Sequence, residues 1–324
     1  MTYRFKLQEP VGEGVRRIGL EQIGIAEAKL ASKGDATTAI HDARRCLKRL
    51  RALLRLIRPG IEEAIYRREV EHLAATGRLL SRARDLAVMH QTLDQLEGRF
   101  GPLPNGATER LCRLLADGRG SSRRSDAAGR RQAVQRMSHA RTLFESKATA
   151  AVRLGHLVDG LGRVYRKARK AFRHAYLEPS DDTFHAWRKQ VQLHWRHMLL
   201  LSRGWPEVLS ARAGEAKELS QLLGEDHDYS ILVTHAGKAD AAFLRPGDIS
   251  SLSALCRARQ AEIRSQAHPR GERLFAEPAR NLEHRVALYW TSAQELATLT
   301  PGKEKKLPKE TSARRPRRAR HRKP

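Results

Sequence analysis

Apolar residues recur three or four positions apart along nearly the whole chain, and this helical spacing limits the fold more than any other feature. Aromatic residues make up only 5% of the sequence, whereas sheet proteins favour aromatic and β-branched residues. A single short stretch, Tyr3–Leu7, is a candidate strand. We therefore predict an all-α protein. Twelve segments with the helical spacing lie between residues 13 and 297, among them 36–57, 181–203, the neighbouring pair 207–223 and 228–240, and the pair 249–267 and 271–297 on either side of Pro269.

A motif in the first half of the chain returns after about 144 residues. His41-Asp-Ala-Arg44-Arg45 aligns with His185-Ala-Trp-Arg188-Lys189, and Asp85 aligns with Asp228 at nearly the same offset. Cap-forming residues precede both histidines and mark the start of a helix, with Asp35 in the first half and Ser180 in the second. The spacing indicates an internal duplication.

The chain is strongly basic, with 62 Lys and Arg against 36 Asp and Glu and a net charge of +26. The positive electrostatic field of such a protein attracts a polyanion or an anionic surface as its partner. Residues 301–324 hold eleven of these cations against two Glu, and we predict a disordered basic tail there. We assign residues 1–300 to one helical domain, with repeat 1 at about 11–98, connecting helices at 99–150 and repeat 2 at about 151–297.

The helix expected over 36–57 carries an apolar stripe and, beside it, a continuous stripe of cations. Seven Lys and Arg and no acid lie between Arg44 and Arg58. Like charges one turn apart repel one another, so the stripe costs stability unless an anion or a facing acidic helix neutralises it. A solvated surface is the alternative interpretation, but such a surface usually mixes both signs of charge.

These residues resemble the CHAD family, the helical domain named for its histidines. The resemblance rests on His41-x-x-Arg44-x-x-x-Lys48-Arg49-x-Arg51 followed by Arg84-Asp85, and on a second copy at Phe184–Lys189 and Leu223–Asp228. It covers about residues 11–297. It implies two antiparallel four-helix bundles related by pseudo-twofold symmetry, with a basic central groove that binds inorganic polyphosphate, and it implies an association with polyphosphate granules.

Helix 36–57 and its repeat at 181–203 are expected to face each other across that groove. Gln192 and Trp195 replace the cations expected in the second copy, so repeat 2 should make fewer phosphate contacts. Asp85 and Asp228 are expected to pair with neighbouring cations and orient them. For His41 and His185, a satisfied core histidine and a direct phosphate contact remain equal alternatives. The candidate polyphosphate ligands are His41, Arg44, Arg45, Lys48, Arg49, Arg51, Arg55, Arg82, Arg84, His185, Arg188, Lys189 and Arg196.

Enzymatic chemistry finds little support in the sequence. The dipeptides His41-Asp42 and His227-Asp228 invite comparison with α-helical metal-dependent phosphohydrolases, but their basic surroundings oppose a dication. The glycine-rich nucleotide-binding loops are missing, and no nucleophilic triad has supporting context. We therefore expect a non-catalytic protein that uses neither a metal nor a cofactor.

Nucleic-acid binding is the strongest rival function, because a stripe of cations also binds the phosphate backbone of DNA or RNA, with release of counterions. Binding of single strands needs aromatic side chains interleaved with the cations, and only Trp195 meets this condition. We keep nucleic acid as a weaker or competing partner and expect no membrane insertion.

The three cysteines lie far apart and form no CxxC pair, which is typical of reduced thiols in a cytosolic protein. The N-terminal residues lack the apolar core of a signal peptide. We therefore expect a cytoplasmic protein, associated with granules where polyphosphate collects.

Overall fold

The computed structural model describes residues 3–32, 35–80, 82–117, 122–239 and 243–299, without the side chains of 82–87, 117 and 122–126. Over these ranges the regular secondary structure is helical and there is no strand, so the all-α prediction is confirmed for the described part. The α-helices are α1 (Val11–Ala31), α2 (Ala36–Ile57), α3 (Glu63–Leu79), α4 (Arg82–Phe100), α5 (Ala107–Asp117), α6 (Ser122–Glu145), α7 (Lys147–Ala150), α8 (Leu154–Leu177), α9 (Asp181–Leu201), α10 (Pro206–Ala236), α11 (Pro246–Phe275) and α12 (Ala279–Leu299).

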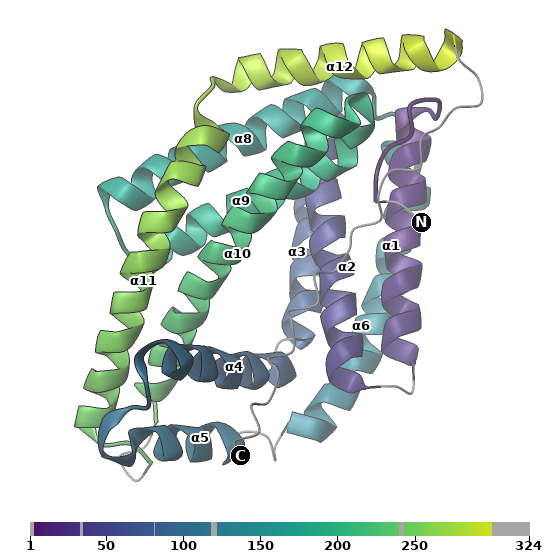
Figure 1. Cartoon of the computed structure of the whole chain (residues 1–324). Helices are drawn as coiled ribbons and strands as arrows, with labels where there is room; N and C mark the ends of the chain where they lie inside the picture. Colours follow the sequence, from purple (N-terminus) through teal and green to yellow (C-terminus); the bar gives the residue numbers. More distant parts are fainter. Residues whose placement is uncertain (1–2, 33–34, 81, 118–121, 240–242, 300–324) are drawn as a thin grey trace, which may run out of the picture.

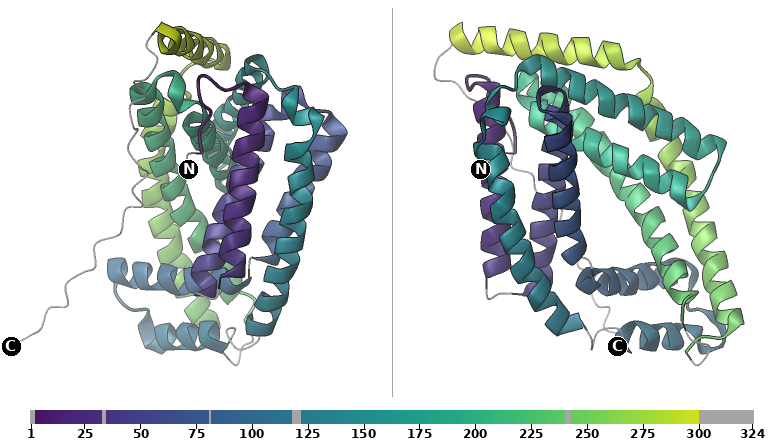
Figure 2. Two further views of the ribbon diagram at one scale, coloured as in Figure 1. Left: turned by 90° about the vertical axis from the view of Figure 1, so that its right-hand side faces the viewer. Right: turned by 180° about the vertical axis from the view of Figure 1, so that it is seen from behind.

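The helices gather in two groups that meet at one end of the molecule and move apart toward the other (Figure 1). α1, α2, α3 and α6 pack against one another in the first group, and α8, α9, α10 and α11 form the second, with α12 lying across α8. α6, which lies among the connecting helices expected at 99–150, packs on α1 and α3, whereas α4 packs mainly on α10. Figure 2 shows α4 and α5 lying across the wide end of the opening between the two groups.

One continuous apolar core joins the two groups, and it includes the fully buried Trp187, Tyr165 and Trp290. A smaller core lies where α4 and α5 meet the far ends of α10 and α11. In α2 the apolar stripe lies in the main core. The side chain of Asp35 accepts hydrogen bonds from the backbone of Thr37 and Thr38, which confirms the predicted start of α2.

Three sequence-based expectations differ from the structure. α10 is continuous from Pro206 to Ala236, so the predicted break between 223 and 228 is wrong. Pro269 lies inside α11 rather than ending it. Tyr3–Leu7 forms no strand; Phe5 is buried in the core and its N–H donates to the carbonyl of Leu200. No described helix is both long and apolar enough to span a lipid bilayer.

Candidate anion-binding site

α2 and α9 touch near their C-terminal halves, where the two helix groups meet. The buried His197 of α9 donates a hydrogen bond from Nε2 to the carbonyl oxygen of Ala52 in α2, at 2.9 Å. Burial lowers the pKa of His197 to about 4, with Arg55 and Arg196 adding to the shift, so the imidazole is neutral at pH 7. From this contact the two helices diverge toward α4 (Figure 1).

A pocket of about 350 Å³ lies between the diverging helices, and we call it the groove pocket. Arg44 and Lys48 from α2 line it on one side, and Arg188 and Lys189 from α9 line it on the other. The pocket therefore brings together four of the cations that the repeated motif singles out. Its remaining lining residues are Val88, His185, Gln192, His227, Asp228 and Ile231.

Two histidines stack on each other in the groove pocket. The rings of His185 and His227 lie 3.8 Å apart between centroids and nearly parallel, at 24°. Burial, with the charges of Lys189 and Arg188, lowers the pKa of His185 to about 4. Burial, with the neighbouring His185 and Arg188, lowers the pKa of His227 to about 3. The pair is therefore uncharged at pH 7, and the fixed positive charge of the pocket comes from Arg and Lys.

A buried ion pair holds α10 and α11 together behind the pocket. The carboxylate of Asp226 accepts a hydrogen bond from Arg264 at 2.7 Å, and Arg264 also pairs with Asp181 of α9 at 2.7 Å. Burial raises the pKa of Asp226, and the hydrogen bond to Arg264 opposes that shift. Asp228, the carboxylate that the sequence motif singles out, lines the groove pocket.

Arg44 has a second role beside lining the groove pocket. Its guanidinium donates to the backbone carbonyls of Gly77 and Leu80, at 3.3 and 3.0 Å. These carbonyls belong to the C-terminal end of α3, where helical oxygens lack partners within the helix. Arg44 therefore ties α2 to the end of α3.

Three other candidate ligands of α2, namely Arg45, Arg49 and His41, are not among the residues that line the groove pocket. Arg45 forms an ion pair with Asp42 at 3.2 Å. Arg49 lies over the ring of Tyr3, 5.0 Å from its centroid. His41, about half exposed, lies beside Asp42 at 3.9 Å. The structure does not bring these three side chains together with Lys48.

Two further candidates are partly or largely buried. Arg196 is 7% exposed, lies over the ring of Trp195 and donates to the carbonyl of Gln192. Burial and the charge of Arg55 lower the pKa of Arg51. The predicted side chains at Arg82, Arg84 and Asp85 fall outside the described residues.

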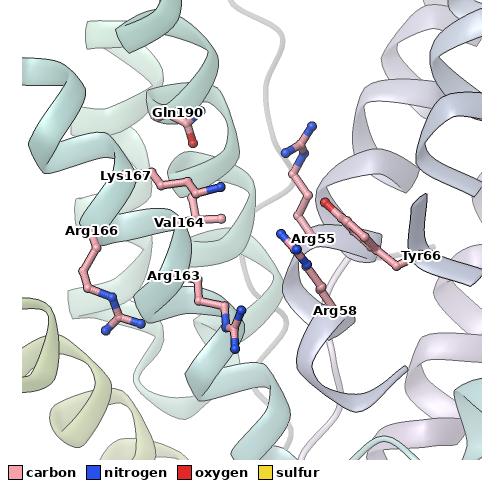
Figure 3. A pocket seen from close by; sticks show the side chains of 8 residues that line it. All are labelled: Arg55, Arg58, Tyr66, Arg163, Val164, Arg166, Lys167 and Gln190. Atoms are coloured by element: carbon pink, nitrogen blue, oxygen red, sulfur yellow. The ribbon is translucent and has the colours of Figure 1, made fainter. Parts of the chain in front are cut away.

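A second basic pocket, of about 360 Å³, lies between α8 and the end of α2, and we call it the α8 pocket. Arg55 joins it from α2, and Arg163, Arg166 and Lys167 join it from α8 (Figure 3). The repeated motif does not include the three residues of α8. The sequence held a signal for them, because residues 160–177 carry six Lys and Arg and no acid, the same criterion that singled out α2.

The dipeptides His41-Asp42 and His227-Asp228 contain residue types that bind metal ions. Across the described residues, no three side chains of His, Cys, Asp or Glu come together in a way that could hold a metal ion.

Comparison with known proteins adds a family and a fold. No curated protein matches the chain. A solved structure titled "PptA from Streptomyces chartreusis" is similar over 83% of this chain and 100% of that chain, with a TM-score of 0.59 and 16% identity. The model of the CHAD domain matches residues 20–237, which span α2, α8, α9 and α10 and all four cations of the groove pocket. The chain belongs to the CHAD domain family.

Proposed function

We propose that this protein binds inorganic polyphosphate in the groove pocket and catalyses no reaction. The observation that carries the proposal is the meeting of Arg44 and Lys48 with Arg188 and Lys189 across one pocket. Membership of the CHAD family supports polyphosphate as the polyanion, since this is the ligand that the family resemblance implies.

The lining of the groove pocket favours polyphosphate over nucleic acid. Among its described lining residues there is no Phe, Tyr or Trp on which a base would stack. The two imidazoles, His185 and His227, already stack on each other. Polyphosphate has no bases to stack. A pocket lined by cations and without aromatic side chains therefore favours polyphosphate over nucleic acid.

The proposal extends to the architecture and the location of the protein. We propose that the two helix groups derive from an internal duplication in which α2 and α9 are equivalent, each group forming a four-helix bundle. The cations of both copies then face one groove. A cytoplasmic protein of this kind would associate with polyphosphate granules by binding the chains at their surface.

Competition binding tests the proposed function. Long-chain polyphosphate and single-stranded DNA of equal total charge compete for the full-length protein at physiological ionic strength. We expect polyphosphate to win by about tenfold, which corresponds to about 1.4 kcal/mol. Deletion of 301–324 should leave this preference in place, because the four cations of the groove pocket belong to α2 and α9. Equal competition would make the protein a general polyanion binder and reject the proposal.

A further inference from the structure

The α8 pocket contains more positive charge than its neighbouring carboxylates neutralise. Two of its cations belong to ion pairs at the rim: Arg58 with Glu63 at 2.8 Å, and Arg166 with Glu283 at 2.7 Å. No carboxylate in the described part of the chain forms an ion pair with the other three cations. These three are Arg55 from α2 and Arg163 and Lys167 from α8.

The three unpaired cations approach the pocket from opposite sides. Arg163 and Lys167 are exposed and lie four residues apart, on one face of α8. Figure 3 shows both on the α8 side of the opening, with Arg55 on the α2 side. Arg58 is held beside them over the ring of Tyr66, 4.6 Å from its centroid. An anion in this space would therefore meet positive charge from two helices at once.

A neutral polar group in the pocket also lacks a partner. The amide oxygen of Gln190 is buried and makes no hydrogen bond to the described residues. The two ends of an amide group have nearly the same shape, and a half-turn would place an N–H donor there instead. Gln190 can thus add a hydrogen bond to an anion without adding charge.

The charge of the α8 pocket fits one part of a polyphosphate chain better than the rest. An interior phosphate carries one negative charge, whereas a terminal phosphate ionises twice, with a second pKa near 6. The last two units of a chain thus carry about three charges at neutral pH, which matches the three unpaired cations. We infer that the α8 pocket holds the doubly ionised end of a polyphosphate chain. The inference rests on the proposed function, because it assumes that polyphosphate is the ligand.

The position of the pocket on α2 allows the rest of the chain to reach the groove pocket. Arg55 follows Lys48 by seven residues and Arg44 by eleven, so all three lie on one face of α2. At 1.5 Å per residue, the two pockets are separated by roughly 10 to 17 Å along the helix. Arg51 occupies the same face between them. α2 therefore offers cations from one pocket to the other.

Two small phosphates test the recognition of chain ends. Tripolyphosphate is a short chain with two ends, and cyclic hexametaphosphate is a ring with none. Calorimetric titration of the full-length protein compares Arg163→Ala/Lys167→Ala with the control Lys170→Ala/Arg173→Ala. The control removes the same charge from exposed positions on the same helix, outside both pockets. Alanine favours helix at all four positions, and circular dichroism checks the fold.

We expect the pocket variant to bind tripolyphosphate about tenfold more weakly or worse, because two charge-assisted contacts are lost. The control variant should bind it as the unmodified protein does, and both variants should bind the ring alike. Equal tripolyphosphate binding by the two variants would overturn the inference. Equal loss of the chain and the ring in the pocket variant would also overturn it, because the pocket would then not distinguish an end.

Failure of this inference is distinguishable from failure of the proposed function. One outcome would be that long-chain polyphosphate binds more tightly than DNA while the loss of Arg163 and Lys167 leaves tripolyphosphate binding unchanged. That outcome would reject the end site and keep the groove pocket as the polyphosphate site. Long-chain polyphosphate that competes no better than DNA would reject the function itself.

Discussion

Replacement of Lys48 and Lys189 by alanine gives the most direct test of the groove pocket. These residues line the pocket from opposite helices, and neither carries the hydrogen bonds to α3 that Arg44 makes. Each hydrogen bond to a charged group contributes at least about 1.5 kcal/mol, so the double variant should lose about 3 kcal/mol of binding free energy, or roughly 150-fold in affinity.

The salt dependence of binding gives a second magnitude from the same variant. If the four cations of the groove pocket each neutralise one phosphate, they contribute about −2.8 to the slope of log affinity against log salt, taking the coefficient for a flexible single strand. Loss of Lys48 and Lys189 should make the slope shallower by about 1.4. Fluorescence titration with long-chain polyphosphate from low to high salt measures both quantities.

The control for this experiment is Lys170→Ala/Arg173→Ala, which removes two charges from the exposed surface of α8. It should retain both the affinity and the slope of the unmodified protein. If the control loses as much as the pocket variant, then the overall field of the protein binds the polyanion and the reasoning from the groove pocket is refuted.

Three further predictions concern stability. The free energy of unfolding should fall as the pH is lowered from about 6.5 to 3, because the fold lowers the pKa values of His185 and His227 to about 4 and about 3 and the unfolded chain binds protons first. Urea titrations at several pH values should show a weaker dependence for His185→Gln/His227→Gln, with the buried His197 supplying part of what remains. Asp226→Ala should cost about 1 to 3 kcal/mol, since it removes the carboxylate to which Arg264 donates and leaves Arg264 with Asp181 alone, and an unchanged urea midpoint would contradict this. Arg44→Ala should destabilise the protein by about 1 kcal/mol or more through the lost hydrogen bonds to α3, and an unchanged thermal midpoint would contradict this.

The helical architecture was largely predictable because helix periodicity and capping are local. Asp35 and Ser180 accept hydrogen bonds from the backbone at the starts of α2 and α9, as their residue types predict. The expected break after 223 failed for a tertiary reason. Gly224 weakens a helix in isolation, but Leu223 and Tyr229 on either side of it are buried in the two cores, and that packing keeps α10 continuous.

The composition of the groove pocket was only partly predictable, because a helical wheel places residues on a face and does not choose their partners. Lys48 and Arg45 both belong to the motif on α2, yet Lys48 lines the pocket while Arg45 pairs with Asp42. The difference comes from Asp42, which also pairs with Lys29 of α1 and draws the neighbouring cation toward that helix. The partner of each cation therefore depends on the position of α1, and the spacing of residues within α2 does not predict that position.

The α8 pocket depends on a contact that sequence periodicity does not reveal. A Cβ atom on Gly160 would lie 1.8 Å from the carbonyl oxygen of Leu56, so α8 crosses α2 with backbone against backbone. Arg163 and Lys167, one and two turns further along α8, therefore line the same pocket as Arg55. Both helices are free of acids in these stretches, and their close approach adds repulsion between helices to the repulsion within each. In the free protein the cations of α2 and α8 repel one another across the α8 pocket. A bound anion removes this repulsion and therefore stabilises the pocket.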